Sequence, residues 1–554
     1  MKLQPHPTEP RYTSVLINNE VVPRVPLFSS MSSKPTAWLA FSVFSAVFGS
    51  SFLFGYNIGV LNAPQNIIGL WIRRTRCMGK GGIPDSEEGM SKHLWCEKLN
   101  KQGETNMFAD NGELNTLWAL INAFIPGGAI LGALASSFLV GRFGPKMSLI
   151  LNNVLAVTAA ILTSLSMTAG SVEMLIIGRF FAGVNSGISA GVTPTYLNEI
   201  SPPNLRGAIG STHPLSIMTA IWISQIFGLP FVLGTSERWP ILLALAAIPA
   251  LFQLVTLPLC PDSPKYLYFS RQDREGAQNA IRKFQGNAKI LTEMTLMEEE
   301  YNHVKDKPKV TIGDLLSDPF LRRTLFIMLA LMVFQMFSGL DAVMFYSTAI
   351  FRSAGLVGDT ALYATIGVGA VNVTMTTIAL FLVEKVGRRV LLLIGFSGII
   401  LFLILLTISL CLFKSGDPGP EFPNAANTYA GAAYASMVSI FGFIIMFASG
   451  PNSIPWILMS EYFVQGPRAA AAGLIAGANR FSSLVVTLSF PYLQAAIGEY
   501  CFIIFGVLNV MAVAFIAIYI VETKGKSTDQ IQRDLRNKMR SQPISEKRLK
   551  ISSS

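Results

Sequence analysis

The strongest constraint on this chain is a series of apolar segments, each about as long as a lipid bilayer is thick. A helix that crosses the hydrocarbon core needs roughly 20 mostly apolar residues. These segments are continuous runs, not the alternating ten-residue stretches of a membrane β-barrel, so we expect an all-α membrane protein with about twelve transmembrane helices. The expected spans cover residues 37–64, 114–140, 147–169, 172–195, 208–234, 239–260, 324–347, 360–384, 390–413, 430–458, 469–494 and 500–521.

Composition argues against a soluble protein. Only 14% of the residues are charged, whereas a soluble globular chain carries about 25%. The formal net charge is +10, but the basic residues stand at the ends of apolar segments. Nucleic-acid binding needs a concentrated basic face and is therefore not expected.

The basic residues predict the orientation of the chain in the membrane. They follow even-numbered spans or precede odd-numbered ones, which places those loops and both termini in the cytosol. The loop 65–113 also carries basic residues, but it is long, contains acids and is expected outside, because long loops cross largely regardless of charge. The topogenic residues are Arg142, Lys146, Arg206, Lys265, Arg322, Arg323, Lys385, Arg388, Arg389, Arg468 and Lys524.

The two halves of the chain repeat one pattern. Glu199 precedes Arg206 by seven residues, and Glu461 precedes Arg468 by seven, so both pairs are offset by 262 (461−199 and 468−206). Duplicated six-helix halves are typical of transporters, which bind substrate between the repeats near the bilayer midplane. We expect the divisions 1–36 (cytosolic tail), 37–260 (six-helix bundle with the extracellular loop 65–113), 261–320 (cytosolic helical linker), 321–523 (second six-helix bundle) and 524–554 (cytosolic tail).

Several short motifs make the chain resemble one family. Their order and spacing are similar to those of the sugar porters of the major facilitator superfamily, most like the animal facilitative hexose transporters. The resemblance runs from about residue 37 to 530. The matching segments are Phe54–Gln65, Gly178–Phe180, Pro261–Lys265, Gln335–Gly339, Glu384–Arg389, Gly450–Pro451, Ile454–Trp456 and Glu522–Gly525.

Charged residues at the cytosolic ends of the helices are candidates for a gate. Opposite charges placed there can pair when the inner ends close and separate when they open, as the resemblance also implies; the alternative is that they only anchor the helices. After Arg142 the family usually has two arginines, where this chain has Pro145 and Lys146. The expected gate comprises Arg142, Arg179, Glu199, Arg206, Asp262, Glu384, Arg388, Arg389, Glu461, Arg468 and Glu522.

A sugar site needs amides that both donate and accept hydrogen bonds, together with apolar or aromatic walls. The resemblance implies such a site at Ile217, Ile221, Gln225, Gln335, Met336, Asp341, Asn372, Trp456, Asn479 and Arg480. Individually, such polar residues are as often contacts between helices. Proton-coupled relatives carry an aspartate in the first span, where this chain has Asn57. An amide does not titrate, so facilitated diffusion is expected.

The chain departs from the family within this site. Pro214, Met336 and Ala448 replace polar residues, and Ser483 replaces an asparagine. Asp341 and Arg480 replace neutral residues. A charge at the bilayer centre costs roughly 2.5–3.5 kcal/mol on insertion scales, so we hypothesise that these two face and neutralise each other; the alternative is that Arg480 snorkels and Asp341 meets water.

Together these features predict facilitative transport of a hexose, with glucose as first candidate, across the plasma membrane by alternating access. The alternatives are a different substrate (another sugar, a polyol or an anionic compound) and a non-transporting sugar sensor. We expect no enzymatic activity, cofactor or metal site. The expected partners are a small sugar and the lipid bilayer, and a monomer suffices for function, although oligomers are compatible with it. Cys77 and Cys96 share the loop 65–113, and the sequence leaves open whether they are bridged or free.

Overall fold

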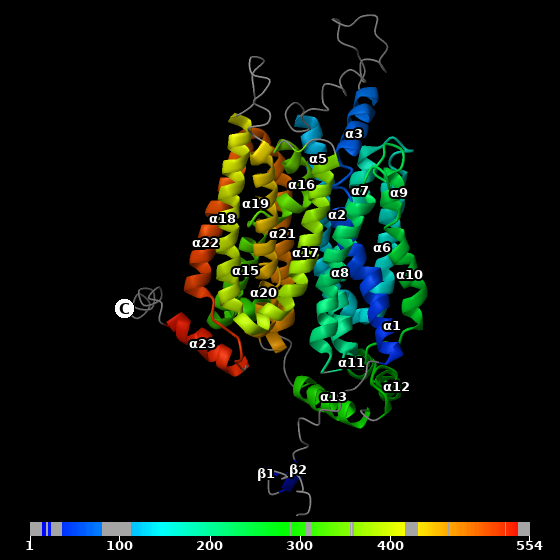
Figure 1. Ribbon diagram of the computed structural model, residues 1–554. Helices are drawn as coiled ribbons and strands as arrows, with labels where there is room; N and C mark the ends of the chain where they lie inside the picture. The colour runs from blue at the N-terminus through cyan, green and yellow to red at the C-terminus, as the bar shows by residue number, and fades with distance from the viewer. Residues whose placement is uncertain are drawn as a thin grey trace, which may run out of the picture.

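The computed structural model describes residues 14–17, 20–23, 36–79, 112–202, 204–287, 290–305, 312–354, 356, 359–415, 430–463, 465–526 and 528–540. Two helical bundles stand side by side, with shorter helices at one end (Figure 1). Helix α8 packs along α17, and α21 packs along α5, so these four helices form the boundary between the bundles.

The N-terminal bundle consists of helices that run between residues 37 and 259. They are α1 (Ala37–Ala46), the π-helix η1 (Val47–Phe52), α2 (Leu53–Gly59), α3 (Gln65–Gly79), α5 (Gly112–Phe143), α6 (Pro145–Leu165), α7 (Val172–Ile200), α8 (Arg206–Phe227), α9 (Trp239–Ala244), α10 (Ala247–Thr256) and η3 (Leu257–Leu259). The C-terminal bundle consists of α15 (Pro319–Met336), α16 (Leu340–Ser353), α17 (Asp359–Val386), α18 (Arg388–Ser415), α19 (Ala430–Ser449), α20 (Ile454–Tyr462), α21 (Gln465–Ile497), η6 (Gly498–Tyr500) and α22 (Cys501–Tyr519).

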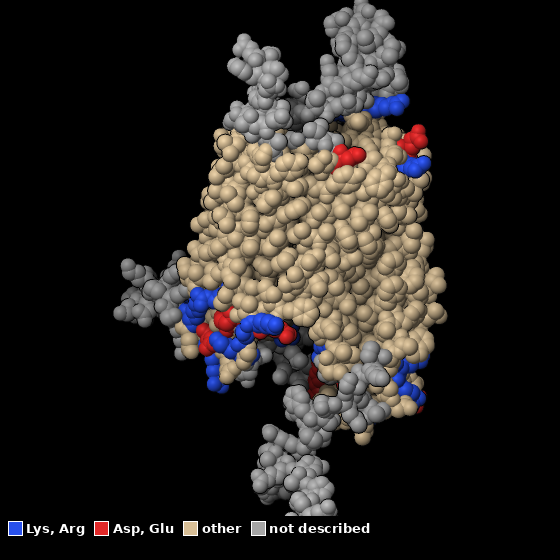
Figure 2. Space-filling model, viewed as in Figure 1, with Lys and Arg blue, Asp and Glu red and all other residues tan. Residues whose placement is uncertain are grey.

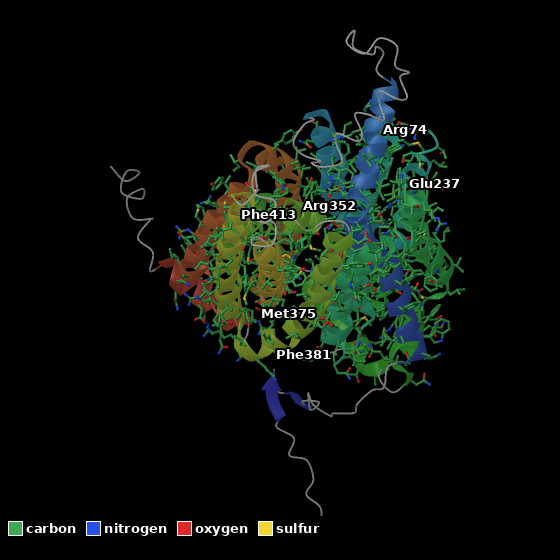
Figure 3. The ribbon with its side chains drawn as sticks, turned by 45° about the horizontal axis from the view of Figure 1, so that its top comes forward. Arg74, Glu237, Arg352, Met375, Phe381 and Phe413 are labelled. Carbon is green, nitrogen blue, oxygen red and sulfur yellow. The ribbon has the colours of Figure 1, made fainter. Side chains whose placement is uncertain are left out.

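The described residues contain ten segments long and apolar enough to cross a bilayer. One of these, Ala470–Tyr519, holds both α21 and α22, and α8 is a further helix of 22 residues. The twelve expected spans are therefore present in the described part of the chain. Figure 2 shows the consequence at the surface, where an uncharged band lies between two ends that carry the charges. Phe381 of α17, labelled in Figure 3, is an apolar side chain that is 67% exposed.

The first span is one continuous helix in which a wider π-helical stretch, η1, separates α1 from α2. Gln253 of α10 fastens this stretch, because its amide donates to the carbonyl of Ser45 at 3.1 Å and accepts from Ser50 at 3.0 Å and from Asn153 at 2.9 Å. A Cβ on Gly49 would overlap the Gln253 side chain. The π-helical stretch η1 is thereby held against α10, whereas α2 packs against α8 and α7.

The C-terminal bundle contains two broken spans. The seventh span is interrupted between α15 and α16, where Gly339 has a φ of +99°, a left-handed conformation that glycine adopts without strain. The tenth span is interrupted between α19 and α20, where Pro451 cannot donate a helical hydrogen bond. Broken helices expose backbone carbonyls in the middle of a membrane, and such positions are typical of transporter binding sites.

The segment between the bundles is helical, as expected. It contains α11 (Pro264–Phe269), α12 (Arg274–Gln285), α13 (Ile290–Lys305) and α14 (Ile312–Ser317). A further helix, α23 (Thr528–Arg540), lies at the same end under the C-terminal bundle (Figure 1), where it buries Ile531 and Leu535. The divisions 1–36, 261–320 and 524–554 remain predictions.

Three details differ from or extend the expectations. The start of the expected loop 65–113 is helical, because α3 packs Trp71 against Trp239 with ring centroids 5.1 Å apart. The N-terminal tail carries a short antiparallel pair, β1 (Ser14–Ile17) and β2 (Glu20–Pro23). Cys96 and the side chain of Cys77 lie outside the described residues, so their pairing stays open.

Candidate functional site between the two bundles

The break in the tenth span is tied to two other helices by Gln335. Its amide nitrogen donates to the carbonyls of Pro451 and Asn452, each at 2.8 Å. Its amide oxygen accepts from Asn479 of α21 at 3.0 Å. Gln335 and Asn479 are buried, and the Asn479 side-chain oxygen has no protein partner. The structure thus brings together two of the predicted site residues and leaves one acceptor there unsatisfied.

Three further predicted residues lie on α17, α15 and α20. Asn372 of α17 is buried, and its amide lies 4.0 Å from the sulfur of Met344 in α16. Met336 is buried at the end of α15, and Trp456 packs half-buried against the apolar core of the C-terminal bundle. Met336 therefore supplies apolar surface at the position where the family has a second amide.

The N-terminal bundle contributes one wall, which is formed by α8. Ile217, Ile221 and Gln225 are all buried on this helix. Gln225 lies against Gly369 of α17, where a Cβ would touch its amide oxygen. Both the nitrogen and the oxygen of this amide are buried without a hydrogen-bond partner. Buried polar groups normally have one, so Gln225 remains a candidate for ligand binding.

Asp341 and Arg480 lie near each other but are not a closed pair. Their charges are close enough to interact. No ion pair up to 4.0 Å joins them, although the structure describes both residues. Arg480 instead lies over the ring of Phe54 in α2, with 5.7 Å between its Cζ and the ring centroid. The predicted mutual neutralisation is therefore not a direct contact here.

At the end away from the linker helices the two bundles are joined by polar contacts. Asn62, which follows α2, donates to the carbonyl of Met344 at 2.8 Å and to the hydroxyl of Ser347 at 2.7 Å. Its oxygen accepts from the amide and hydroxyl of Thr348 at 3.3 and 3.1 Å. Tyr492 of α21 donates to a threonine of α5 at 2.9 Å. Asn62 was not predicted as a functional residue; its amide directly before Ala-Pro at the span end was the only sequence signal.

Toward the other end the same bundles separate. Leu484 of α21 touches α5 at Gly127, at 3.7 Å from the Cβ that a side chain there would carry. Gly473, Gly477 and Arg480 lie on the same face of α21 as Leu484, by the helical repeat of 3.6 residues. A Cβ on Gly473 or Gly477 would meet nothing within 4 Å. Open space therefore faces the N-terminal bundle from this part of α21, and it begins beside Arg480.

The expected gate charges of the N-terminal bundle contact their own half and the linker. Glu199 accepts a hydrogen bond from Ser263, which precedes α11. Asp262 accepts from the Ser263 backbone amide at 2.8 Å, and its burial raises the pKa of its carboxyl despite that bond and the nearby Lys146. Arg142 and Arg206 are exposed.

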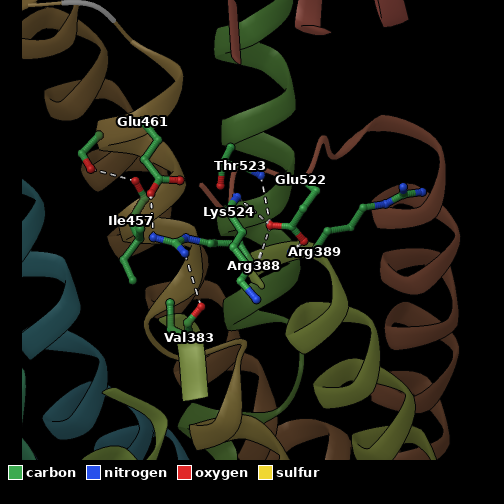
Figure 4. A network of polar contacts seen from close by, with 9 residues as sticks. Val383, Arg388, Arg389, Ile457, Glu461, Glu522, Thr523 and Lys524 are labelled. Atoms are coloured by element: carbon green, nitrogen blue, oxygen red, sulfur yellow. Dashed lines mark hydrogen bonds and ion pairs between the residues drawn. The ribbon is translucent and has the colours of Figure 1, made fainter. Parts of the chain in front are cut away.

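The C-terminal bundle has a tighter network at the corresponding place (Figure 4). Arg388 pairs with Glu461 at 3.1 Å. Glu522 accepts from the backbone amides of Arg388 and Arg389 at 2.9 and 3.0 Å, which are the first residues of α18. Arg468 donates to the carbonyl of Phe463 at 3.0 Å, whereas Glu384 is exposed. None of these contacts joins one bundle to the other.

Arg179 does not belong with the other gate residues. It precedes Glu199 on α7 by 20 residues (199−179), or about 30 Å along the helix. Its guanidinium is buried and donates to the carbonyls of Asn57 at 2.6 Å and Ile121 at 3.4 Å. The prediction that Arg179 belongs to the cytosolic gate was wrong, because it used the charge of the residue and ignored the direction in which the helix runs. Arg179, on α7, instead joins the end of α2 to α5 through these two hydrogen bonds.

The sequence of this chain is similar to that of known transporters. The family description "Sugar (and other) transporter" matches residues 42–535. The "Solute carrier family 2, facilitated glucose transporter member 1" of Gallus gallus is 38% identical over 499 residues, which cover 90% of this chain and 94% of that relative. Member 4 from Homo sapiens is also 38% identical and covers 90% of each chain.

Solved structures agree with this fold. The "partially occluded inward open conformation of the xylose transporter XylE from E. coli" has a TM-score of 0.68 at 22% identity and covers 89% of this chain and 100% of its own. An inward open form of the same transporter has a TM-score of 0.67. The match over residues 42–535 and the identity of 38% together show that the chain belongs to the sugar (and other) transporter family, as a non-enzymatic membrane transporter with the major facilitator fold.

Proposed function

We propose that this protein carries a hexose across the plasma membrane by facilitated diffusion, through alternating access to a site between its two bundles. The relatives at 38% identity are named facilitated glucose transporters, and this supports glucose as the first substrate to test. We place both termini in the cytosol, because the charged linker helices and α23 lie at one end and basic loops stay inside.

The observation that supports the proposal is that α21 and α5 are in contact toward one end and separated toward the other, so that a wedge-shaped space lies between them. The bundles touch at Asn62 and Leu484 and separate at Gly477 and Gly473. Partnerless buried amide atoms, on Gln225 and Asn479, lie on helices that border the two halves. Rocking of the two halves would close this wedge and break the Asn62 contacts, which is the alternating exposure that such repeats perform.

The first experiment is uptake of labelled glucose, fructose and inositol by proteoliposomes that contain the full chain, with and without a proton gradient. We expect saturable glucose uptake that does not change with the gradient, since Asn57 cannot titrate. Uptake that appears only with a gradient would replace diffusion by symport. Binding without any uptake would instead favour the sensor alternative.

The contacts that join the two bundles at Asn62 supply a second test. The contacts of Asn62 hold the end with α16 closed, so Asn62→Ala removes four hydrogen bonds of this state. We expect the open-to-cytosol state to become less populated, by about tenfold for each 1.4 kcal/mol lost. Accessibility of a cysteine introduced at Gly477 measures this population, and unchanged labelling would contradict the assignment.

A further inference from the structure

The π-helical stretch η1 in the first span holds one residue more than a regular α-helix would need to join α1 to α2. An α-helix bonds each carbonyl to the amide four residues further on, whereas a π-helix bonds it to the amide five residues further on. The extra residue is absorbed in the wider turn, and the helix beyond keeps its rotation. Such stretches are rare and are frequent at functional sites, so the contacts of η1 indicate what the extra residue does.

Gln253 of α10 supplies hydrogen bonds where this stretch begins. Its amide nitrogen donates to the carbonyl of Ser45 at 3.1 Å and to the carbonyl of Ala46 at 3.4 Å. These are the last two residues of α1, where the spacing of the backbone bonds changes. The amide oxygen accepts from Ser50 and Asn153, and the whole side chain is buried. Gln253 thus provides a donor at the point where the α-helical ladder is interrupted.

Beyond η1, α2 fits against α8 in one rotation, because two glycines face α8 closely. A Cβ on Gly55 would overlap the carbonyl oxygen of Ile217, and a Cβ on Gly59 would overlap the hydroxyl of Ser224. A larger residue at either place would therefore require the two helices to move apart. If η1 became a regular α-helix, the extra residue would turn α2 by about 100° and advance it by about 1.5 Å.

The extra residue therefore decides which side chains stand at these two close contacts. Without it, each residue of α2 would take the place of the residue that follows it. Phe54 would then stand where Gly55 does, and its ring would meet the backbone of α8. Ile58 would replace Gly59 in the same way. Asn62, which follows α2, would turn away from the atoms of α16 to which it donates.

We propose that Gln253 is a positioning residue for transport, which stabilises the extra residue of η1 and thereby sets the rotation of α2 that contact between the bundles requires. Gln253 is bonded to the first span and to α6, both in its own bundle, so it acts on the other bundle through the first span. This inference rests on the proposed function, because transport is one of its readouts.

The test combines a substitution with a deletion. Gln253→Met removes the donor to Ser45 and Ala46 at similar volume, so uptake of glucose by proteoliposomes should fall by about tenfold or more. Deletion of Val47, the first residue of η1, should also lower uptake, because a regular helix would leave the Gln253 amide without its acceptors. The two changes together should restore most of the uptake, since the backbone then closes its own bonds and α2 keeps its rotation.

Ser50→Ala is the matched control. It removes one bond to the Gln253 oxygen and leaves both donated bonds in place, so uptake should stay near that of wild type. A second readout needs no sugar, because it is the labelling of a cysteine introduced at Gly477. Labelling should fall in Gln253→Met, as in Asn62→Ala, and should return when the Val47 deletion is added.

Additive losses in the double variant would overturn the proposal, since a deletion in the first span cannot replace a side chain that merely fills space in α10. If Gln253→Met does not fold, a folded double variant supports the proposal, and a double variant that also fails to fold overturns it. If wild type takes up no glucose while the labelling still follows the expected order, the transport function fails and the role of Gln253 in positioning α2 stands.

Discussion

The two bundles share one fold, but they differ in which of their spans are continuous helices and which are interrupted. In the N-terminal bundle the fourth span, α7, runs unbroken for 29 residues, and the first span keeps its helical course through a π-helical stretch, whereas the sixth is divided at 245–246 between α9 and α10. In the C-terminal bundle the seventh and tenth spans are interrupted, at Phe337–Gly339 and at Gly450–Ser453. The polar site lies beside these interruptions, because the carbonyls of Pro451 and Asn452 are bound there by Gln335.

Glycines show the same contrast. In the N-terminal bundle Gly128, Gly132, Gly183 and Gly187 let α5 and α7 approach so closely that a Cβ on any of them would overlap the backbone of the other helix. Small residues at such spacings are typical of tight membrane helix pairs. In the C-terminal bundle Gly473 and Gly477 of α21 face open space, although Gly395, Gly398 and Gly442 pack tightly between α18 and α19. The α5–α7 pair therefore forms a tightly packed wall, whereas α21 leaves open space beside the site.

We expect the largest loss of stability from a substitution where α5 and α7 pack together. Gly187→Ala would push a methyl group into the backbone of Ala129, and overpacking of this kind costs about 3 kcal/mol at the upper end of its range. We expect a clear fall in the apparent melting temperature of the purified protein. The matched control, Gly477→Ala, should leave it unchanged or slightly higher, since that methyl meets nothing within 4 Å. Equal losses in both variants would refute the contrast.

A middle-sized effect separates two amides of the site. Gln335→Met removes the donor to Pro451 and Asn452 and leaves both carbonyls unsatisfied, at a cost of about 1–3 kcal/mol. Gln225→Met removes an amide that already has no partner, so the ligand-free protein should lose no stability. Both variants should lose the stabilisation that glucose confers. Thermal unfolding with and without glucose measures both quantities, and a destabilised ligand-free Gln225→Met would show that this amide has a structural role.

Much of this architecture could be predicted from the sequence, and the parts that could not have physical reasons. Apolar runs of bilayer length predicted the twelve spans, since burial in lipid imposes length and composition directly. Motif resemblance predicted Gln335 and Asn479, which do meet. The position of Arg179 was mistaken, because a positive charge near a span end says nothing about which end it occupies. Asn62 was missed because its partners are 282 and 285 residues away in the chain.

The separation of Asp341 from Arg480 could not be predicted either. Two opposite charges in one membrane site suggest a closed pair, because the alternative is an unpaired charge in a poorly solvated place. The structure offers Arg480 an aromatic ring and open space instead. Which arrangement forms depends on side-chain direction across the boundary between the bundles, and helical periodicity within one span does not contain that information.

We expect the smallest changes in stability at two acids that occupy equivalent positions in the two halves. Asp262 follows the last span of the first half and Glu522 that of the second, 260 residues later (522−262). Burial raises the pKa of Asp262. Burial also acts upward on Glu522, but the backbone amides of Lys524, Arg388, Arg389 and Thr523 outweigh it and lower its pKa. The ionised form of the carboxyl is therefore disfavoured at Asp262 and favoured at Glu522.

The two acids should respond to pH with opposite signs. The pKa of Glu522 is lower in the folded than in the unfolded protein, so its contribution is complete above the unfolded value of about 4.3 and is lost as the pH falls through the folded value. The pKa of Asp262 is higher in the folded protein, so its ionisation opposes folding at neutral pH, and this penalty disappears as the pH falls. We expect Glu522→Gln to lower and Asp262→Asn to raise the neutral-pH melting temperature slightly. Each effect should be below about 1 kcal/mol, because both sites are partly exposed. The Asp262→Asn shift should shrink as the pH falls toward the unfolded value of about 3.9, whereas the Glu522→Gln shift should persist down to about 4.3 and shrink only below it. Shifts of the same sign at neutral pH would show that the halves do not differ here.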